Sequence, residues 1–268
     1  YKLFPNAISY VNPCFPFGGM SFDSKFKMIN KFFHYPEFTT KTILINQENR
    51  DLEKIYKLLN EMEINFPFVA KPDKAHRGNG FKIIRNEIEL QTYLEICNRD
   101  FLIQEYINYP YEYGIFYVRI PGEFGEIQSI TRKVLPEVIG DGKSTLSELI
   151  FKDKRAKYLA EVYLNKNVER LQFILSKDDK FRLCNAGNHC QGAIFEDGFE
   201  DIQNETRRKL KEICSSIKGF DFGRMDIKFK DLDSLKNGKN FKILEVNGSE
   251  AEMTHIYDRR YSLLEAYH

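Results

Sequence analysis

The stretch GRMDIKFKDLDSLKNGKNFKILEVN, residues 223–247, decides the fold of this 268-residue chain. Residues 223–230 and 240–247 each read as a strand, and the polar segment between them reads as a hairpin-like connection. Side chains at positions i and i+2 of a strand lie on the same face of a sheet. The two strands therefore predict one polar wall and one apolar wall, as the side of a cleft requires.

Three oxygen-bearing side chains come together on this predicted pair of strands. Asp226 lies on the first strand, and Glu245 and Asn247 lie on the second, with Arg224 beside them. Carboxylate and amide oxygens suit Mg²⁺, which also takes phosphate oxygens and keeps some of its waters. Arg224 would then offset charge on a transferred phosphoryl group or an oxyanion. The structural alternative is cross-strand ion pairing on a solvent-exposed face.

A lysine at the end of a second buried strand offers a binding group for phosphate. The strand FPFVAKP, residues 66–72, places Lys71 beside the loop 73–80. A glycine-containing loop can bring backbone N–H groups close to the same anion. The loop residues that we assign to this role are Arg77, Gly78 and Gly80. The alternative is a surface lysine followed by an ordinary turn.

A third segment, IQEYINYPYE at residues 103–112, ends an apolar strand at a carboxylate. We expect Glu105, Tyr106 and Ile107 to present groups to an adenine ring. Glu112, seven residues after Glu105, could accept hydrogen bonds from ribose hydroxyls. Taken alone, both acids read better as solvated loop charges.

The remaining chain reads as a mixture of helices and strands with no repeat. Strands at 42–46, 66–72, 81–84 and 100–107 alternate with helices at 50–62 and 86–98 and form a small lobe. A helix over 23–33 precedes them. The second lobe combines antiparallel strands at 113–120, 126–135 and 181–185 with the strands 223–230 and 240–247, and it has helices at 144–150, 155–175 and 204–217. The pattern predicts an α+β or mixed α/β fold built as two lobes.

Composition narrows the function further. Lys and Arg number 40 against 39 Asp and Glu, so the chain has no general field that would attract nucleic acid. No apolar run reaches the ~20 residues of a membrane span. Five cysteines form no CxxC pair, which fits a reduced, cytoplasmic setting. Cys184, His189 and Cys190 have poor zinc-ligand spacing, and we read these cysteines as idle or buried thiols.

In order and local spacing, these motifs resemble those of the ATP-grasp ligases, particularly D-alanine–D-alanine ligase, over residues 23–258. VAKP resembles the strand of the phosphate-binding lysine, QEYINYPYE the adenine and ribose segment, and GRMD and LEVN the metal-binding strands. Lys25 resembles a further phosphate-binding lysine, although Ser24 interrupts that motif. Residues 138–150 are similar to a segment of cyanophycin synthetase. Residues 248–255 differ from the corresponding family segment, and the resemblance does not extend over most of the family's N-terminal domain.

The resemblance implies a two-lobed ATP-grasp fold with the nucleotide between the lobes. We expect an N-terminal segment at 1–30, a small lobe at 31–109 and a large lobe at 110–268. It also implies an ATP-dependent ligase that uses Mg²⁺, with Mn²⁺ as an alternative, and that joins a small-molecule carboxylate to an amine through an acyl phosphate. The substrates would be amino acids or peptides, and a homodimer is one option for the oligomeric state. Candidate substrate residues are Arg119, Lys133, Arg155, His189, Glu250 and His255.

Two alternatives of other classes stay open. The same nucleotide cleft could serve a kinase that phosphorylates a hydroxyl, or a regulatory module that binds ATP without turnover. GDGKS at residues 140–144 is no P-loop, because Glu137 stands where the first glycine is required; we expect a turn near the acceptor site. Residues 185–192 either close over the acyl phosphate or form a self-contained turn.

Overall fold

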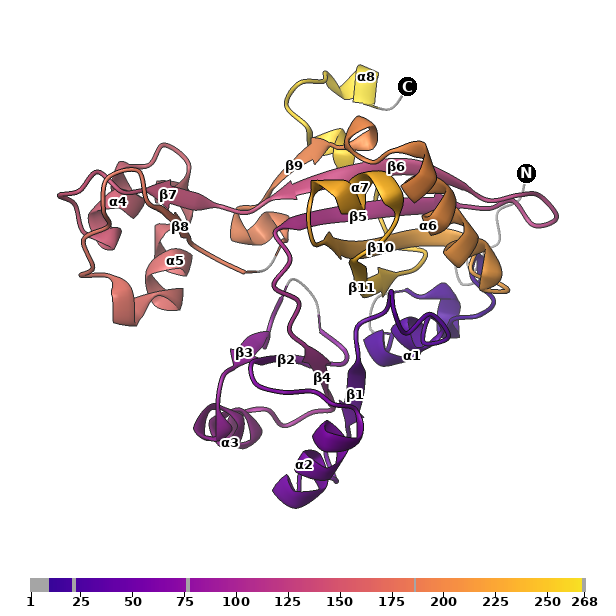
Figure 1. Cartoon of the computed structure of the whole chain (residues 1–268), viewed down its shortest axis with the longest axis horizontal. Helices are drawn as coiled ribbons and strands as arrows, with labels where there is room; N and C mark the ends of the chain where they lie inside the picture. The colour runs from indigo at the N-terminus through magenta and orange to yellow at the C-terminus, as the bar shows by residue number, and fades with distance from the viewer. Residues whose placement is uncertain (1–9, 21–22, 76–77, 186, 267–268) are drawn as a thin grey trace. The chain divides into compact units, whose positions relative to one another are not determined.

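The computed structural model describes residues 10–20, 23–75, 78–185 and 187–266 (Figure 1). Contacts divide the chain into two compact units. Unit 1 comprises Tyr1–Arg132 and Asp197–Ile256, and unit 2 comprises Lys133–Glu196 and Tyr257–His268. Within the described ranges, no helix is both long and apolar enough to cross a membrane.

The first part of unit 1 is a four-stranded sheet with the order β1-β4-β2-β3, in which all neighbouring strands are antiparallel. The strands are β1 (Thr42–Ile45), β2 (Phe68–Pro72), β3 (Lys82–Ile84) and β4 (Phe101–Glu105). Two helices, α2 (Leu52–Glu61) and α3 (Glu87–Ile96), share a core with this sheet. Asp51 and Asn86 cap their first turns by accepting hydrogen bonds from backbone N–H groups.

A five-stranded sheet has the order β11-β10-β5-β6-β9. Its strands are β5 (Tyr111–Val118), β6 (Glu126–Val134), β9 (Ile194–Asp197), β10 (Phe222–Phe229) and β11 (Phe241–Asn247). The helices α6 (Asn204–Ser216) and α7 (Leu232–Asn237) lie over its apolar face in Figure 1. Short 3-10 turns are η2 (Pro16–Gly18), η6 (Phe199–Asp201) and η7 (Thr254–Tyr257).

The N-terminal segment is fixed to unit 1 by Asn12, whose side chain has no exposed surface. Its amide nitrogen donates to the carbonyls of Gly18 and Phe222, and its amide oxygen accepts from the N–H groups of Asp221 and Phe222. A buried amide with all four bonds made is a strong local constraint. It ties the chain that precedes α1 (Lys25–Asn30) to the start of β10.

Unit 2 has a core of its own around Val138, Leu146 and Tyr163. A two-stranded antiparallel sheet pairs β7 (Glu137–Ile139) with β8 (Lys180–Arg182). The helical elements are α4 (Leu146–Lys152), η3 (Ala156–Leu159), α5 (Ala160–Lys166), η4 (Val168–Arg170), η5 (His189–Gln191) and α8 (Leu263–Ala266).

The α+β class and its antiparallel sheets are confirmed, but three local predictions were wrong. The helix predicted at 155–175 is broken into η3, α5 and η4, because Leu159 and Asn167 leave helical backbone geometry. The expected hairpin-like connection contains α7, which Asp231 caps and which Gly238 ends with a left-handed backbone. The segment 181–185 does not extend the large sheet, since β8 pairs with β7.

Candidate functional site

The predicted metal ligands lie directly opposite one another on β10 and β11. Asp226 pairs with Glu245 and Arg224 pairs with Asn247, whereas the next pair is Ile227 with Ile243. Leu244 is therefore an extra residue, a β-bulge in the second strand.

The bulge decides which face Glu245 occupies. Without it, strict alternation would place Glu245 on the face of Phe241 and Ile243, which are buried in the core. One extra residue shifts the phase, so that Val246 is buried in the core and Glu245 and Asn247 face the other way. The convergence expected from the sequence is thus present, but a bulge produces it rather than plain alternation.

Glu245 is the meeting point of the two predicted phosphate-binding lysines. Lys25 Nζ lies 2.9 Å from Glu245 Oε1, and Lys71 Nζ lies 4.0 Å from Oε2. Both lysine side chains are largely buried, with 17% and 13% of their surface exposed. The charges of Asp226 and Glu112 also favour the protonated form of Lys71 and so raise its pKa. The structure therefore gathers one residue from each predicted motif around two ammonium groups.

The two lysines differ in their electrostatic state. Burial lowers the pKa of Lys71, and the carboxylate of Glu245 only partly opposes this effect. Burial also acts on Lys25, but its close ion pair and hydrogen bond with Glu245 outweigh it and raise its pKa. Lys71 is therefore a buried cation with an incomplete set of counter-charges, which is the environment that an added anion would improve.

Arg224 is held over the same surface. Its Nε lies 3.1 Å from Asp226 Oδ1, and its Nη1 donates to the carbonyl of Glu252. Its stem crosses Gly114 of β5, where an added Cβ would lie 3.0 Å from Arg224 Cδ. A larger residue at position 114 would require this stem to shift by a few tenths of an ångström.

The acids of the predicted nucleotide segment have different surroundings. Glu112 is buried on β5, opposite Lys228 of β10. The carboxylate of Glu105 accepts a hydrogen bond from the backbone N–H of Lys41 and forms an ion pair with the ammonium of Lys242. It therefore links β4 to Lys41 and to β11. Tyr106 is half-buried, and the carbonyl of the buried Ile107 accepts a hydrogen bond from Lys228.

The loop after β2 has the glycine geometry that a close backbone approach needs. Gly78 and Gly80 both have positive φ angles, of 71° and 73°. Asp73 bonds the base of this loop to α1. Its carboxylate accepts a hydrogen bond from the backbone N–H of Phe26, and its carbonyl accepts one from the backbone N–H of Lys25. Arg77 lies outside the described residues.

Arg119 does not lie free for a substrate. Its guanidinium pairs with Asp221 at 2.6 Å and donates to the carbonyls of Ser215, Ile217 and Phe220. Four acceptors on the chain use its fork of donors. We therefore leave Arg119 out of the proposed site.

The other substrate candidates are divided between the two units. In unit 2, Lys133 is buried, Arg155 reaches the carbonyls of Gly192 and Ala193, and His189 packs against the rings of Phe195 and Tyr257. In unit 1, Glu250 is exposed and His255 Nδ1 lies 2.8 Å from Ser129 Oγ. Their substrate roles stay predictions.

The sequence analysis did not identify Asp73 and Gln104, which form hydrogen bonds to segments that carry the candidate site residues. Gln104 precedes Glu105 in β4 and is 3% exposed, and its amide reaches the carbonyl of Leu244. A buried amide in an otherwise apolar strand, FLIQE, is the signal that could have marked it.

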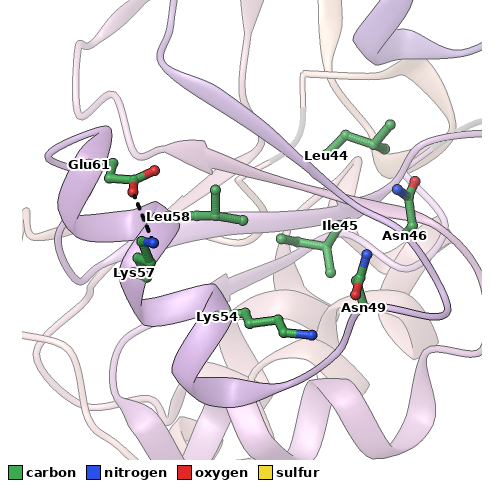
Figure 2. Close-up of a pocket in the computed structure, with 8 residues that line it drawn as sticks. All are labelled: Leu44, Ile45, Asn46, Asn49, Lys54, Lys57, Leu58 and Glu61. Atoms are coloured by element: carbon green, nitrogen blue, oxygen red, sulfur yellow. Dashed lines mark ion pairs between the residues drawn. The ribbon is translucent and has the colours of Figure 1, made fainter.

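A cavity of about 450 Å³ lies elsewhere, between β1 and α2 (Figure 2). Leu44, Ile45 and Leu58 form its apolar part, and Lys54, Lys57, Glu61 and two asparagines form the rest. Lys57 pairs with Glu61 at 4.0 Å. None of the predicted site residues line it.

The donor set around Glu245 fits Mg²⁺ together with phosphate. It offers two carboxylates and one amide oxygen of the hard type that Mg²⁺ prefers, with two ammonium groups for the phosphates. Across the part of the chain that the structure describes, no three His, Cys, Asp or Glu side chains gather into a site made of these residues alone. Phosphate oxygens and water would therefore have to complete the coordination shell.

Comparisons with known proteins bear on the fold of the chain. No family model matches the chain. VanG D-Ala:D-Ser ligase from Enterococcus faecalis superposes with a TM-score of 0.52 at 13% identity, over 91% of this chain and 59% of that chain. D-Alanine–D-alanine ligase from Helicobacter pylori gives a TM-score of 0.46 at 16% identity, over 97% and 60%.

The chain has the ATP-grasp ligase fold. It is also a distant homologue of cyanophycin synthetase from Synechocystis sp. (strain ATCC 27184 / PCC 6803 / Kazusa), with 26% identity over 213 residues. That match covers 71% of this chain and 24% of the relative, so the chain spans about a quarter of the relative's length.

Proposed function

We propose that this chain is an ATP-dependent carboxylate–amine ligase that forms an amide or peptide bond and releases ADP and phosphate. One observation carries the proposal: two buried lysines from separate segments meet at Glu245, which is paired across the sheet with Asp226. Carboxylates that lie beside lysines suit a nucleoside triphosphate with its metal ion, because the carboxylates can bind the metal and the lysines the phosphates.

Each residue would have a distinct part. Lys71 and Lys25 would bind phosphate oxygens, and the glycines 78 and 80 would let backbone N–H groups approach them. Asp226, Glu245 and Asn247 would hold Mg²⁺, which neutralises charge on the β- and γ-phosphates. Arg224 would stabilise the oxyanion formed when an amine attacks the activated carboxylate.

The segment around Ile107 and the buried Glu112 would bind the nucleoside. Glu112 lies close enough to Lys71 for its charge to affect the pKa of that lysine. A ribose and a phosphate could therefore be bound within one site. Glu105 would act through its backbone, because its carboxylate is already bonded to Lys41 and Lys242.

The names of the similar proteins favour ligation over the kinase alternative. Two of them are named as amino-acid ligases and one as a synthetase. We extend from these names only the class of substrate, an amino acid or peptide that supplies the carboxylate and another that supplies the amine. A homodimer in the cytoplasm stays a prediction.

Product analysis of ATP tests the proposal. The protein is incubated with Mg²⁺ and pools of carboxylates and amines, and ADP is separated from AMP. ADP and phosphate that appear only with both pools support ligation. AMP and pyrophosphate would overturn the acyl-phosphate route, and ADP without any amine would favour the kinase. A parallel sample of Glu245→Gln should give none of these products above background.

A further inference from the structure

Gln104 of β4 contacts the strand that carries the proposed metal ligand. Its Nε2 lies 3.1 Å from the carbonyl oxygen of Leu244, the bulged residue that precedes Glu245. We propose that Gln104 is a positioning residue for metal binding: it holds the bulge in β11 that turns Glu245 toward Asp226. This inference rests on the proposed function and names a residue that acts on the metal through another.

The bulge needs an external partner. Leu244 has no opposite residue on β10, and β11 is the edge strand of its sheet. A backbone carbonyl at a bulge has lost its regular ladder partner, and leaving it unpaired in a buried region is costly. The amide of Gln104, itself 3% exposed, supplies that partner from the neighbouring four-stranded sheet.

Two threonines fix the orientation of the Gln104 amide. Its Nε2 lies 2.8 Å from Thr40 Oγ1 and 2.9 Å from Thr42 Oγ1. The hydroxyl of Thr40 donates to the carbonyl of Ile243, and that of Thr42 donates to the carbonyl of Thr40. Because both hydroxyl protons are used, both oxygens present lone pairs, and the NH₂ end of Gln104 must face them. The two N–H bonds are therefore shared among three acceptors.

The residue before the bulge is held from the same side. Ile243 donates its N–H to the carbonyl of Phe38 at 2.7 Å, and its carbonyl accepts from both the N–H and the hydroxyl of Thr40. A second tie runs from Glu105 to Lys242 at 3.4 Å. Residues 242–244 are thus bonded to the segment 38–40 and to β4, immediately before the chain reaches Glu245.

Loss of the Gln104 donor should leave the carbonyl of Leu244 without this partner and loosen the bulge. Glu245 would then be held less firmly beside Lys25 and Asp226. The expected effect falls on metal-dependent nucleotide binding, whereas a residue with a purely structural role would lower stability alone. Replacing a residue that orients a metal ligand through a hydrogen bond typically changes metal affinity by about 10–100-fold.

The test compares Gln104→Met and Gln104→Glu with Thr206→Val by calorimetric titration of ATP, with and without Mg²⁺. Gln104→Met keeps the length of the side chain and removes the donor, and Gln104→Glu places an acceptor against the Leu244 carbonyl. Thr206 is the control, since its buried hydroxyl bonds to the carbonyl of Ser234 and so joins α6 to α7 rather than holding β11. We expect the gain in ATP affinity from Mg²⁺ to fall about tenfold or more in both Gln104 variants and to be unchanged in Thr206→Val.

An unchanged Mg²⁺ effect in a folded Gln104→Met protein would overturn the inference, as would an equal loss in Thr206→Val. If Gln104→Met does not fold, Thr42→Val removes one acceptor that orients the amide and should give a smaller shift in the same direction; no shift there would also overturn it. Wild-type protein that binds ATP equally with and without Mg²⁺ would overturn the proposed function as well. A metal-dependent wild type with unaffected variants would leave the proposed function standing.

Discussion

The ammonium of Lys25 lies 2.9 Å from Oε1 of Glu245, so a residue near the start of the described chain is ion-paired with one near its end. The N-terminal segment is brought there by Asn12, which bonds to both Gly18 and Phe222. The pair balances charge at the point where Lys71 also approaches. Glu245 therefore has two roles in our proposal, as a counter-ion for the lysines and as a metal ligand.

Replacing Glu245 by Gln should abolish turnover and leave the fold intact. The change keeps the shape of the side chain and removes the charge that Mg²⁺ needs. A metal ion supplies several kcal/mol of transition-state stabilisation, and each ~1.4 kcal/mol is tenfold in rate, so kcat/KM should fall by about 10²-fold or more. The measurement is Mg²⁺-dependent ADP release.

Asp226→Asn should behave in the same way, and circular dichroism should show a native spectrum for both variants. Glu95→Gln is the surface control, because Glu95 is exposed on α3. Wild-type-like turnover in both site variants would falsify the metal assignment. Equal inactivation of Glu95→Gln would show that the assay reports general damage.

Lys71→Met should weaken ATP binding without a loss of stability. The folded protein holds this ammonium in a buried place that disfavours its charge. Removing this ammonium relieves its desolvation cost, and Glu245 keeps Lys25 as its counter-ion, so the free energy of unfolding should not fall. Lys57→Met is a matched control, since Lys57 is 78% exposed and lies on α2. A large stability loss in Lys71→Met with unchanged ATP affinity would contradict the assignment.

The same variant has a pH signature. Burial lowers the pKa of Lys71 in the folded state, so the unfolded chain binds the proton more tightly. Wild-type stability should therefore rise relative to Lys71→Met as the pH increases from the lowered folded pKa toward the ordinary value of 10.5. Urea titrations at pH 7 and pH 9.5 would measure the gap, which should favour the variant most at the lower pH. A gap that widens with pH would contradict the sign of the shift.

Much of this site could be read from the sequence because its signals are local. Arg224-x-Asp226 and Glu245-x-Asn247 lie on short apolar runs that read as strands, and their pairing follows from adjacency. The bulge at Leu244 could not be read, because it depends on a hydrogen bond from Gln104, 140 residues away in the chain. Regular alternation would put Glu245 on the same face as Phe241 and Ile243, which are buried. This mismatch indicates an irregular strand but not where the bulge lies.

Arg119 was named from the sequence as a candidate substrate residue, but in the structure its guanidinium is bonded within the chain. An arginine at the end of a strand resembles a substrate-binding group when only its neighbours in sequence are considered. Its acceptors, Ser215, Ile217, Phe220 and Asp221, come from a segment about a hundred residues later. Long-range packing of that kind leaves no trace in local composition.

Arg119→Ala should therefore destabilise the protein and leave nucleotide affinity unchanged. Removing one partner of a mostly buried charged pair costs about 3–5 kcal/mol, since Asp221 loses its counter-ion and three carbonyls lose a donor. Arg119→Lys should rescue little, because an ammonium cannot reproduce the planar fork. Thermal unfolding and ATP titration of the folded protein measure the two properties. A stable variant with altered substrate affinity would return Arg119 to the site.

Lys143→Ala should leave ATP affinity within about twofold of wild type. GDGKS forms a turn in which Asp141 accepts hydrogen bonds from the N–H groups of Lys143 and Ser144 and from the Ser144 hydroxyl. Lys143 is exposed, and its ammonium is not needed for that turn. A P-loop lysine would contact the β- and γ-phosphates, and its loss would greatly weaken nucleotide binding. A strong loss of affinity would move the phosphate site from Lys71 to unit 2.

The turn itself should be sensitive to acid through Asp141. Hydrogen bonds from Ser144 and Lys143 hold the pKa of this carboxyl well below its usual value of 3.8. A carboxyl with a lowered folded pKa stabilises the native state above its unfolded pKa, and this contribution is lost as the pH falls through the folded value. Asp141→Ala should therefore melt below wild type at pH 7, and the difference should shrink as the pH is lowered past 3.8. Melting curves at pH 7, 5 and 3 measure this, with Glu161→Ala as the control, because Glu161 is exposed on α5 in unit 2. A difference that is constant with pH would show that the turn depends on the shape of Asp141 rather than its charge.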